Sequence, residues 1–141
     1  MSKNKSNNNS NKIFILLGPN LNLLKMQTPI KLTTDKLNRH IKKKSQENNN
    51  QVIIFQTNEE GKAIGKLQKY RKKISAIIFY PGPWNKSGYS ILDLLNIIKI
   101  PYITISHAGK GGIFKGVKNL EGDDFLKLTD QAFYLLNNEI I

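Results

Sequence analysis

The stretch Leu16–Leu24, LLGPNLNLL, decides how the fold of this chain is interpreted. It overlaps the end of the continuous apolar run Ile13–Leu17, a pattern typical of a strand that is buried on both faces of a parallel sheet. Gly18 and Pro19 predict a tight turn, which places the side chain of Asn20 at the carboxyl end of that strand. Ligands of open parallel sheets bind beyond the carboxyl ends of the strands, so this loop is expected to border a functional site.

Short apolar runs alternate with amphipathic stretches along the rest of the chain. Strands are predicted at 13–17, 51–56, 74–79, 102–106 and 117–120. Helices are predicted after a cap at Thr33 or Thr34 and around 63–70, 90–98 and 123–138. This order predicts right-handed crossovers and an α/β fold, a three-layer αβα sandwich with a central parallel sheet of about five strands. Residues 1–12 are polar and basic, so we expect a disordered tail followed by one domain at 13–141.

The composition excludes several kinds of site. The 141 residues include no cysteine and two histidines, His40 and His107, which argues against disulfides, thiolate chemistry and histidine-rich metal centres. We therefore expect no metal and no cofactor. No apolar run approaches the roughly 20 residues that cross a bilayer, and the opening stretch lacks the apolar segment of a signal peptide. A cytoplasmic location is the expectation, with an organellar one left open.

The chain is strongly basic, with 22 Lys and Arg residues against 10 Asp and Glu residues, a net charge of +12. Such a charge favours nucleic acid, anionic lipid or an anionic small molecule as a partner. However, Arg39 and Arg71 are the only arginines, and arginine is the residue best suited to bidentate phosphate and base contacts. Lys, Asn and Ile share A/T-rich codons and make up 56 of the 141 residues, so nucleotide composition also explains the charge. The charge alone therefore identifies no partner.

Four motifs resemble those of the type II 3-dehydroquinases, the small flavodoxin-like dehydratases of the shikimate pathway. They are GPNLNLL at 18–24, FQTNEEG at 55–61, PGPWNKS at 81–87 and PYITIS at 101–106. The resemblance extends from Lys12 to about Asn138, with a shortening after Gly112. It implies a flavodoxin-like fold, homo-oligomers such as trimers or dodecamers, and the dehydration of 3-dehydroquinate to 3-dehydroshikimate through an enolate.

The resemblance assigns catalytic roles to positions, and most of these positions hold other residues here. In the family a lid tyrosine is the base, an arginine keeps it ionised, a histidine is the acid and an asparagine helps to hold the enolate. Asn20 matches that asparagine. The arginine position is Gln27, the tyrosine position is Leu32 and the histidine position is Ser106. The base, its activator and the acid are therefore all replaced.

The substrate-binding positions are partly kept. Tyr80 stands where the family has the asparagine of its NPG loop, and Thr104 where it has the glutamate that orients the catalytic histidine. Lys86 occupies the position of a substrate-binding histidine. Asp93 matches the family's aspartate, and Lys115 replaces a substrate-binding arginine with a point charge.

Substitute groups lie near the replaced positions. His107 is one residue beyond the acid position, and the alternation of side chains along a strand turns it to the opposite face unless a bulge re-aims it. A packing histidine is the simpler interpretation. Lys25 or Lys31 as a substitute base competes with the simpler reading of a solvated lysine. The backbone near His107 and Ala108, with the glycines at 109–112, predicts an anion nest, for which a plain glycine turn is an equal alternative.

Three functions follow from the sequence. The first is a diverged dehydratase that is weak or inactive, with Asn20 and His107 as its remaining catalytic candidates. The second is a non-catalytic structural or scaffolding subunit, in a nucleic-acid or ribosome-like assembly. The third is a module that binds a small anion in the residual pocket, with a small carboxylate among the ligands considered. Because each catalytic group contributes about 10²–10⁴ in rate, the replacement of three favours inactivity.

Overall fold

The computed structural model describes residues 11–26 and 32–141. The expectations for the tail at 1–10, for Gln27 as a replaced position and for Lys31 as a base lie outside the described residues, as does the side chain of Lys25. The first strand begins at Lys12, so this residue belongs to the sheet.

The centre of the molecule is a sheet of five strands in the order β2-β1-β3-β4-β5. The strands are β1 (Lys12–Leu17), β2 (Gln51–Gln56), β3 (Ala76–Tyr80), β4 (Tyr102–Ser106) and β5 (Lys118–Glu121). All neighbouring pairs are parallel. The order reverses between β1 and β3, as in flavodoxin-like doubly wound folds. The predicted α/β fold with a flavodoxin-like parallel sheet is therefore confirmed.

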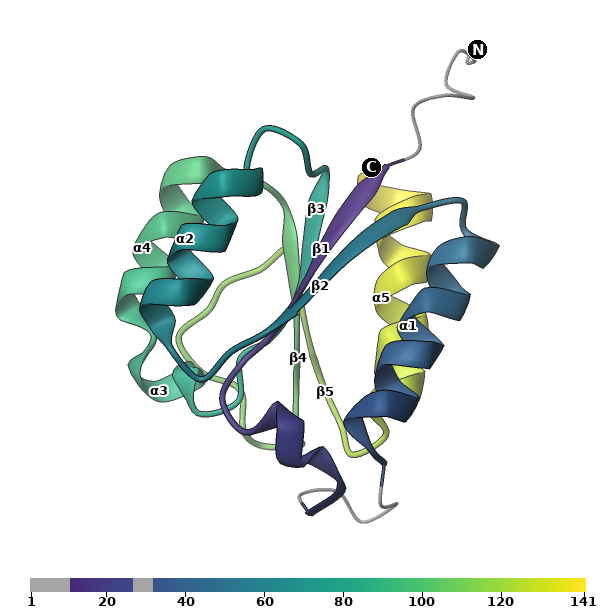
Figure 1. The fold of residues 1–141 in the computed structure, drawn as a ribbon, viewed down its shortest axis with the longest axis horizontal. Coiled ribbons are helices and arrows are strands. Elements are labelled where there is room, and N and C mark those ends of the chain that lie inside the picture. The colour runs from purple at the N-terminus through teal and green to yellow at the C-terminus, as the bar shows by residue number, and fades with distance from the viewer. Residues whose placement is uncertain (1–10, 27–31) are drawn as a thin grey trace.

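Helices cover both faces of the sheet (Figure 1). On one face lie α1 (Thr34–Glu47) and α5 (Phe125–Leu135), and on the other lie α2 (Glu60–Tyr70) and α4 (Tyr89–Ile98). Successive residues of β1 alternate between the two layers: Ile13 and Ile15 pack toward α1 and α5, whereas Phe14 packs toward α2 and α4. The two apolar cores meet the sheet from opposite sides, which explains why the central strands are apolar throughout.

The carboxyl ends of the strands lie together at one edge of the sheet, the lower edge in Figure 1. Two short elements that the apolar periodicity did not predict lie at this edge: the 3₁₀ segment η1 (Leu21–Met26) and the short helix α3 (Trp84–Ser87). Elements of four to six residues carry too few apolar repeats to produce a helical pattern. At the C-terminus, α5 continues into the π-helical turn η2 (Leu136–Ile140). None of the helices formed by the described residues is long and apolar enough to cross a membrane.

The N-terminus of α1 is formed as the sequence predicts. Thr33 caps the helix by accepting a hydrogen bond from the Lys36 N–H at 3.1 Å. His40 on α1 is half-buried, and its Nε2 lies 2.6 Å from Oδ1 of Asp130 on α5. This contact ties α1 to α5, and sequence periodicity cannot reveal it because the two residues are 90 positions apart.

Candidate functional site

A pocket of about 330 Å³ opens at the carboxyl ends of β3 and β4. Its lining comes from η1, β3, α3, β4, the loop after β4 and the start of α5: Leu21, Tyr80, Gly82, Pro83, Asn85, Lys86, Ile105, Ser106, His107, Lys110 and Phe125. We call this space the β3/β4 pocket. It lies where an open parallel sheet places its ligands.

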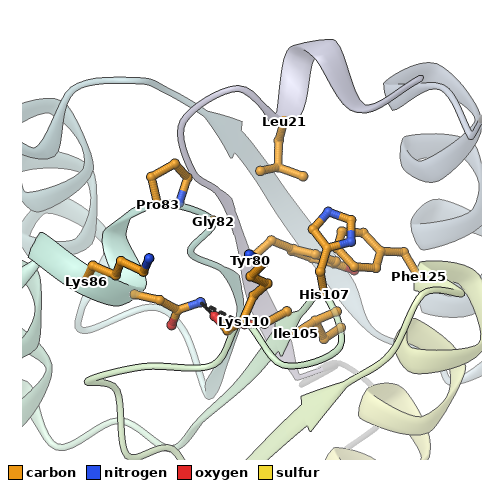
Figure 2. Close-up of a pocket in the computed structure, with 11 residues that line it drawn as sticks. Leu21, Tyr80, Gly82, Pro83, Lys86, Ile105, His107, Lys110 and Phe125 are labelled. Carbon is orange, nitrogen blue, oxygen red and sulfur yellow. Dashed lines mark hydrogen bonds between the residues drawn. The ribbon is translucent and has the colours of Figure 1, made fainter. Parts of the chain in front are cut away.

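Basic side chains line the β3/β4 pocket, and no carboxylate is among the lining residues. Figure 2 shows Lys86 on one side and the His107 and Phe125 rings on the other. The imidazole of His107 stacks on the phenyl ring of Phe125, with ring centroids 4.6 Å apart and an interplanar angle of 26°. Lys110, from the glycine-rich loop, is the third basic residue of the lining.

The position of His107 differs from the expectation based on strand alternation. Strand β4 ends at Ser106, so the two-residue period no longer applies to the next residue. Ser106 and His107 therefore both line the pocket. The stacking on Phe125 agrees with the packing role that the sequence favoured for His107.

Ser106 and Thr104 occupy the β4 positions that the family resemblance assigns to the acid and to the group that orients it. Each has a hydroxyl that is hydrogen-bonded to a side-chain amide. Ser106 is buried, and its Oγ accepts a hydrogen bond from Asn85 Nδ2 at 2.9 Å. Thr104 is also buried, and its Oγ1 donates to Asn119 Oδ1 at 2.7 Å. Neither hydroxyl titrates in the physiological range, so these positions hold the loops in place and supply no proton-transfer group.

The replaced lid position belongs to the core. Leu32 is 4% exposed and packs in the apolar layer that contains Leu21, Leu24 and Leu37. Its side chain has no ionisable group, and it is absent from the residues that line the β3/β4 pocket.

Among residues 11–26 and 32–141, Tyr80 is the only tyrosine that lines the β3/β4 pocket, and it does not replace the missing base. Its hydroxyl lies 2.6 Å from Thr129 Oγ1, which itself donates to the Phe125 carbonyl oxygen at 2.6 Å. Because the Thr129 hydrogen is used in that second bond, the Tyr80 hydroxyl is the donor of the first. Burial raises the pKa of the Tyr80 phenol above its ordinary value. The phenol therefore stays protonated at neutral pH, and its ring forms part of the pocket wall.

The raised pKa of Tyr80 predicts a specific loss of stability in alkali. An unfolded tyrosine ionises near pH 10, whereas the folded Tyr80 stays protonated, so stability falls as pH rises above about 10. The contribution of Tyr80 to this slope is about 1.4 kcal/mol per pH unit. Tyr80→Phe is expected to cost about 1 kcal/mol at pH 8 through the lost hydrogen bond, and this deficit is expected to shrink above pH 10. Urea unfolding of both proteins between pH 8 and pH 11 measures the difference, and parallel pH curves would contradict the assignment.

The glycine-rich loop after β4 is organised around a carboxylate of the chain itself. The Gly109 N–H donates to Glu121 Oε1 at 3.0 Å, and the Lys110 N–H donates to the His107 carbonyl oxygen at 2.9 Å. A Cβ atom on Gly111 would lie 2.3 Å from Glu121 Oε2, so the carboxylate lies directly against the loop. Glu121 therefore accepts the hydrogen bond of the Gly109 N–H, a group that belonged to the predicted anion nest.

The other residues predicted for the site lie on different segments of the chain. Asn20 is exposed with φ of 68°, and its backbone N–H donates to Asn58 Oδ1 at 3.0 Å. Asp93 is exposed on α4, and Ala108 is exposed in the turn after β4. Lys115 lines a smaller polar cavity with Thr104 and Glu121, beside β4 and β5. None of these four lines the β3/β4 pocket, whereas Lys86, Ser106 and His107 do.

Sequence reasoning missed three residues that organise the site. Asn85 is buried and uses both of its amide hydrogens, one for Ser106 Oγ and one for the Lys110 carbonyl oxygen, each at 2.9 Å. Phe125 supports His107, and Glu121 holds the glycine-rich loop. Asn85 was within a recognised motif, but its partners are 21 and 25 residues away and no local signal identifies them. The described residues hold no group of three or more His, Asp or Glu side chains placed for a metal ion.

Comparisons with known proteins agree with this architecture. The family model described as dehydroquinase class II matches residues 11–109. A 3-dehydroquinate dehydratase of Clostridium botulinum (strain Hall) is 35% identical over 98 residues, which are 67% of this chain and 67% of that protein. The corresponding protein of Caldicellulosiruptor bescii is 34% identical over 98 residues, which are 67% of this chain and 68% of that protein.

Solved structures extend the likeness of the fold to nearly the whole chain. A type II dehydroquinase from Butyrivibrio crossotus superimposes with a TM-score of 0.83 at 24% identity, covering 92% of this chain and 99% of that one. A 3-dehydroquinate dehydratase-like protein from Bifidobacterium longum gives a TM-score of 0.67 at 14% identity, covering 89% and 98%. The sequence match ends at residue 109, where the glycine-rich loop begins, so the remaining residues keep the fold with a divergent sequence. This chain belongs to the class II dehydroquinase family.

Proposed function

We propose that this chain is a dehydroquinase-family protein that binds a small carboxylate in the β3/β4 pocket and has little or no dehydratase activity. The observation that carries the proposal is the chemistry at the acid position. The Ser106 hydroxyl is engaged by Asn85, and the tyrosine beside it, Tyr80, is held protonated by burial. The β3/β4 pocket therefore has basic residues for an anion but no ionised base for removing a proton from carbon.

The magnitude of the expected loss follows from the groups that are replaced. A positioned acid or base contributes about 10²–10⁴ in rate, and groups that act as a unit are not additive. Leu32 and Ser106 replace two members of that unit. The binding of a carboxylate needs only the fixed charges of Lys86, Lys110 and the pocket walls, so it survives the loss of the proton-transfer groups.

The purified protein is expected to give no enone absorbance above background when it is mixed with 3-dehydroquinate. A dehydratase such as that of Clostridium botulinum, assayed beside it, establishes the detection limit. A turnover rate within three decades of that enzyme would overturn the proposal. In that case His107→Ala identifies the acid, because abolished turnover would assign proton transfer to His107 and an unchanged rate would exclude it.

We further expect the chain to form homo-oligomers. Tyr89, Asp93 and Ile97 follow one another at four-residue spacing on the outer face of α4, where Tyr89 is 61% and Ile97 is 65% exposed. Exposed apolar side chains contribute to a protein interface where they form a contiguous patch. The face supports self-association of the kind that the family resemblance implies.

A further inference from the structure

The β3/β4 pocket has an apolar wall and a basic rim, and this combination restricts what it binds. Leu21, Ile105 and Phe125 supply hydrocarbon to the lining and are only 1–3% exposed. Tyr80 also belongs to the lining, but it is 1% exposed and its hydroxyl is directed to Thr129. Figure 2 shows these side chains around one space, with the basic residues Lys86, His107 and Lys110 beside them. An apolar wall with a few charged groups is the usual composition of a site for a small organic molecule.

The polar groups of the wall are already engaged within the protein. Asn85 donates to Ser106 Oγ and to the Lys110 carbonyl oxygen, so both of its amide hydrogens are used. The Tyr80 hydroxyl donates to Thr129. A ligand ring that carries several hydroxyl groups would lose its water at these positions without gaining equivalent hydrogen bonds, which is unfavourable for each hydroxyl left unpaired.

The charged groups, in contrast, suit a single carboxylate. Lys86 and Lys110 are both exposed, so their ammonium groups are hydrated and accessible to an anion at the rim. Among the described residues, no Asp or Glu lines the pocket, so no carboxylate of that lining competes for the lysines or repels a ligand carboxylate. A flat ring placed against the apolar lining, beside the stacked His107 and Phe125 rings, leaves its carboxylate at this rim.

We propose that the β3/β4 pocket selects a small aromatic or otherwise apolar carboxylate over the polyhydroxylated ring of 3-dehydroquinate. This inference rests on the proposed function, because it names the class of ligand for the same pocket. The replacement of an asparagine by Tyr80 at the start of the PGPWNKS loop exchanges an amide for a ring at the wall.

Binding of benzoate and of quinate to the full chain tests this inference, with backbone amide shifts in NMR titrations as the readout. The two probes carry the same charge, but quinate has a ring with several hydroxyl groups. Benzoate is expected to bind at least about tenfold more tightly than quinate and to shift the amides of 105–110. Equal binding, or tighter binding of quinate, would overturn the inference while leaving carboxylate binding in place.

Two lysine substitutions test whether benzoate binds in the β3/β4 pocket. Lys110→Gln is expected to weaken benzoate at least threefold, whereas Lys118→Gln, an equal change of charge at an exposed β5 residue outside the pocket lining, is expected to leave it unchanged. An equal loss in both variants would show binding governed by net charge and would overturn the site. Absence of binding by either probe at millimolar concentration overturns both this inference and the carboxylate-binding proposal, whereas turnover of 3-dehydroquinate overturns the claim of inactivity alone.

Discussion

Gly18→Ala is expected to remove about 3 kcal/mol of folding stability. Gly18 follows β1 directly, and its N–H donates to the Tyr80 carbonyl oxygen at 2.9 Å. A Cβ atom there would lie 2.6 Å from the Pro81 carbonyl oxygen and 2.9 Å from that of Tyr80. Both contacts are to backbone at the end of a central strand, so relief requires β1 and β3 to separate. The midpoint of urea unfolding measures the loss.

Gly65→Ala is the matched control for this variant. Gly65 is exposed within α2, and a Cβ atom there meets nothing within 4 Å. The same chemical change is expected to stabilise the protein by about 0.5–1 kcal/mol, because alanine favours the helix. A Gly18→Ala protein as stable as the parent would show that the ends of β1 and β3 separate without cost, contrary to their burial.

Gly112→Ala is expected to cost about 2 kcal/mol and to abolish binding in the β3/β4 pocket. A Cβ atom on Gly112 would lie 2.0 Å from the Asn85 carbonyl oxygen, the same oxygen that accepts the Ile113 N–H at 2.9 Å. Asn85 also holds Ser106 and the Lys110 carbonyl oxygen, so its displacement moves α3 and the glycine-rich loop together. Urea unfolding and benzoate titration report the two effects separately.

Gly111→Ala provides the neighbouring control, since neither glycine has a positive φ that would favour glycine for backbone reasons. Its Cβ would approach Glu121 Oε2, the end of a flexible side chain that can rotate away. The expected cost is therefore only about 1 kcal/mol, the hydrogen bond to the Gly109 N–H, and the pocket is expected to keep its ligand. Equal losses of binding in the two variants would indicate a general sensitivity of the loop and would contradict the role of the Asn85 contact.

The fold was predictable because its signals are local. Strands β2 and β4 begin and end where the apolar runs predicted, and β1, β3 and β5 differ by one or two residues at their ends. Buried parallel strands are rich in apolar residues, and amphipathic helices repeat every three to four residues, so most elements are marked within their own sequence. The exposed β5, with the sequence KNLE, is the strand with the weakest pattern. The short elements α3 and η1 have no apolar periodicity that would predict them. The partnership of His40 with Asp130 was equally invisible, because it depends on how α1 and α5 pack.

The site was predictable only in part. Resemblance placed Lys86 and Ser106 at the pocket, and the structure brings both into its lining. Strand alternation failed for His107 because β4 ends one residue earlier. Asn20 and Lys115 match positions of the family site but lie outside the β3/β4 pocket, and Asn85, Glu121 and Phe125 were not singled out at all.

The sequence by itself determined the parallel sheet, the family and the identity of the groups that are replaced at the catalytic positions. Each of these can be identified from a contiguous run of residues. Only the tertiary structure decided what those replacements do. Ser106 became a partner of Asn85, Tyr80 became a protonated wall residue, and Glu121 came to hold the loop after β4. A side chain's hydrogen-bond partner and its exposure to water are set by segments distant in the chain, and these two properties fix whether the group can ionise and what it can bind.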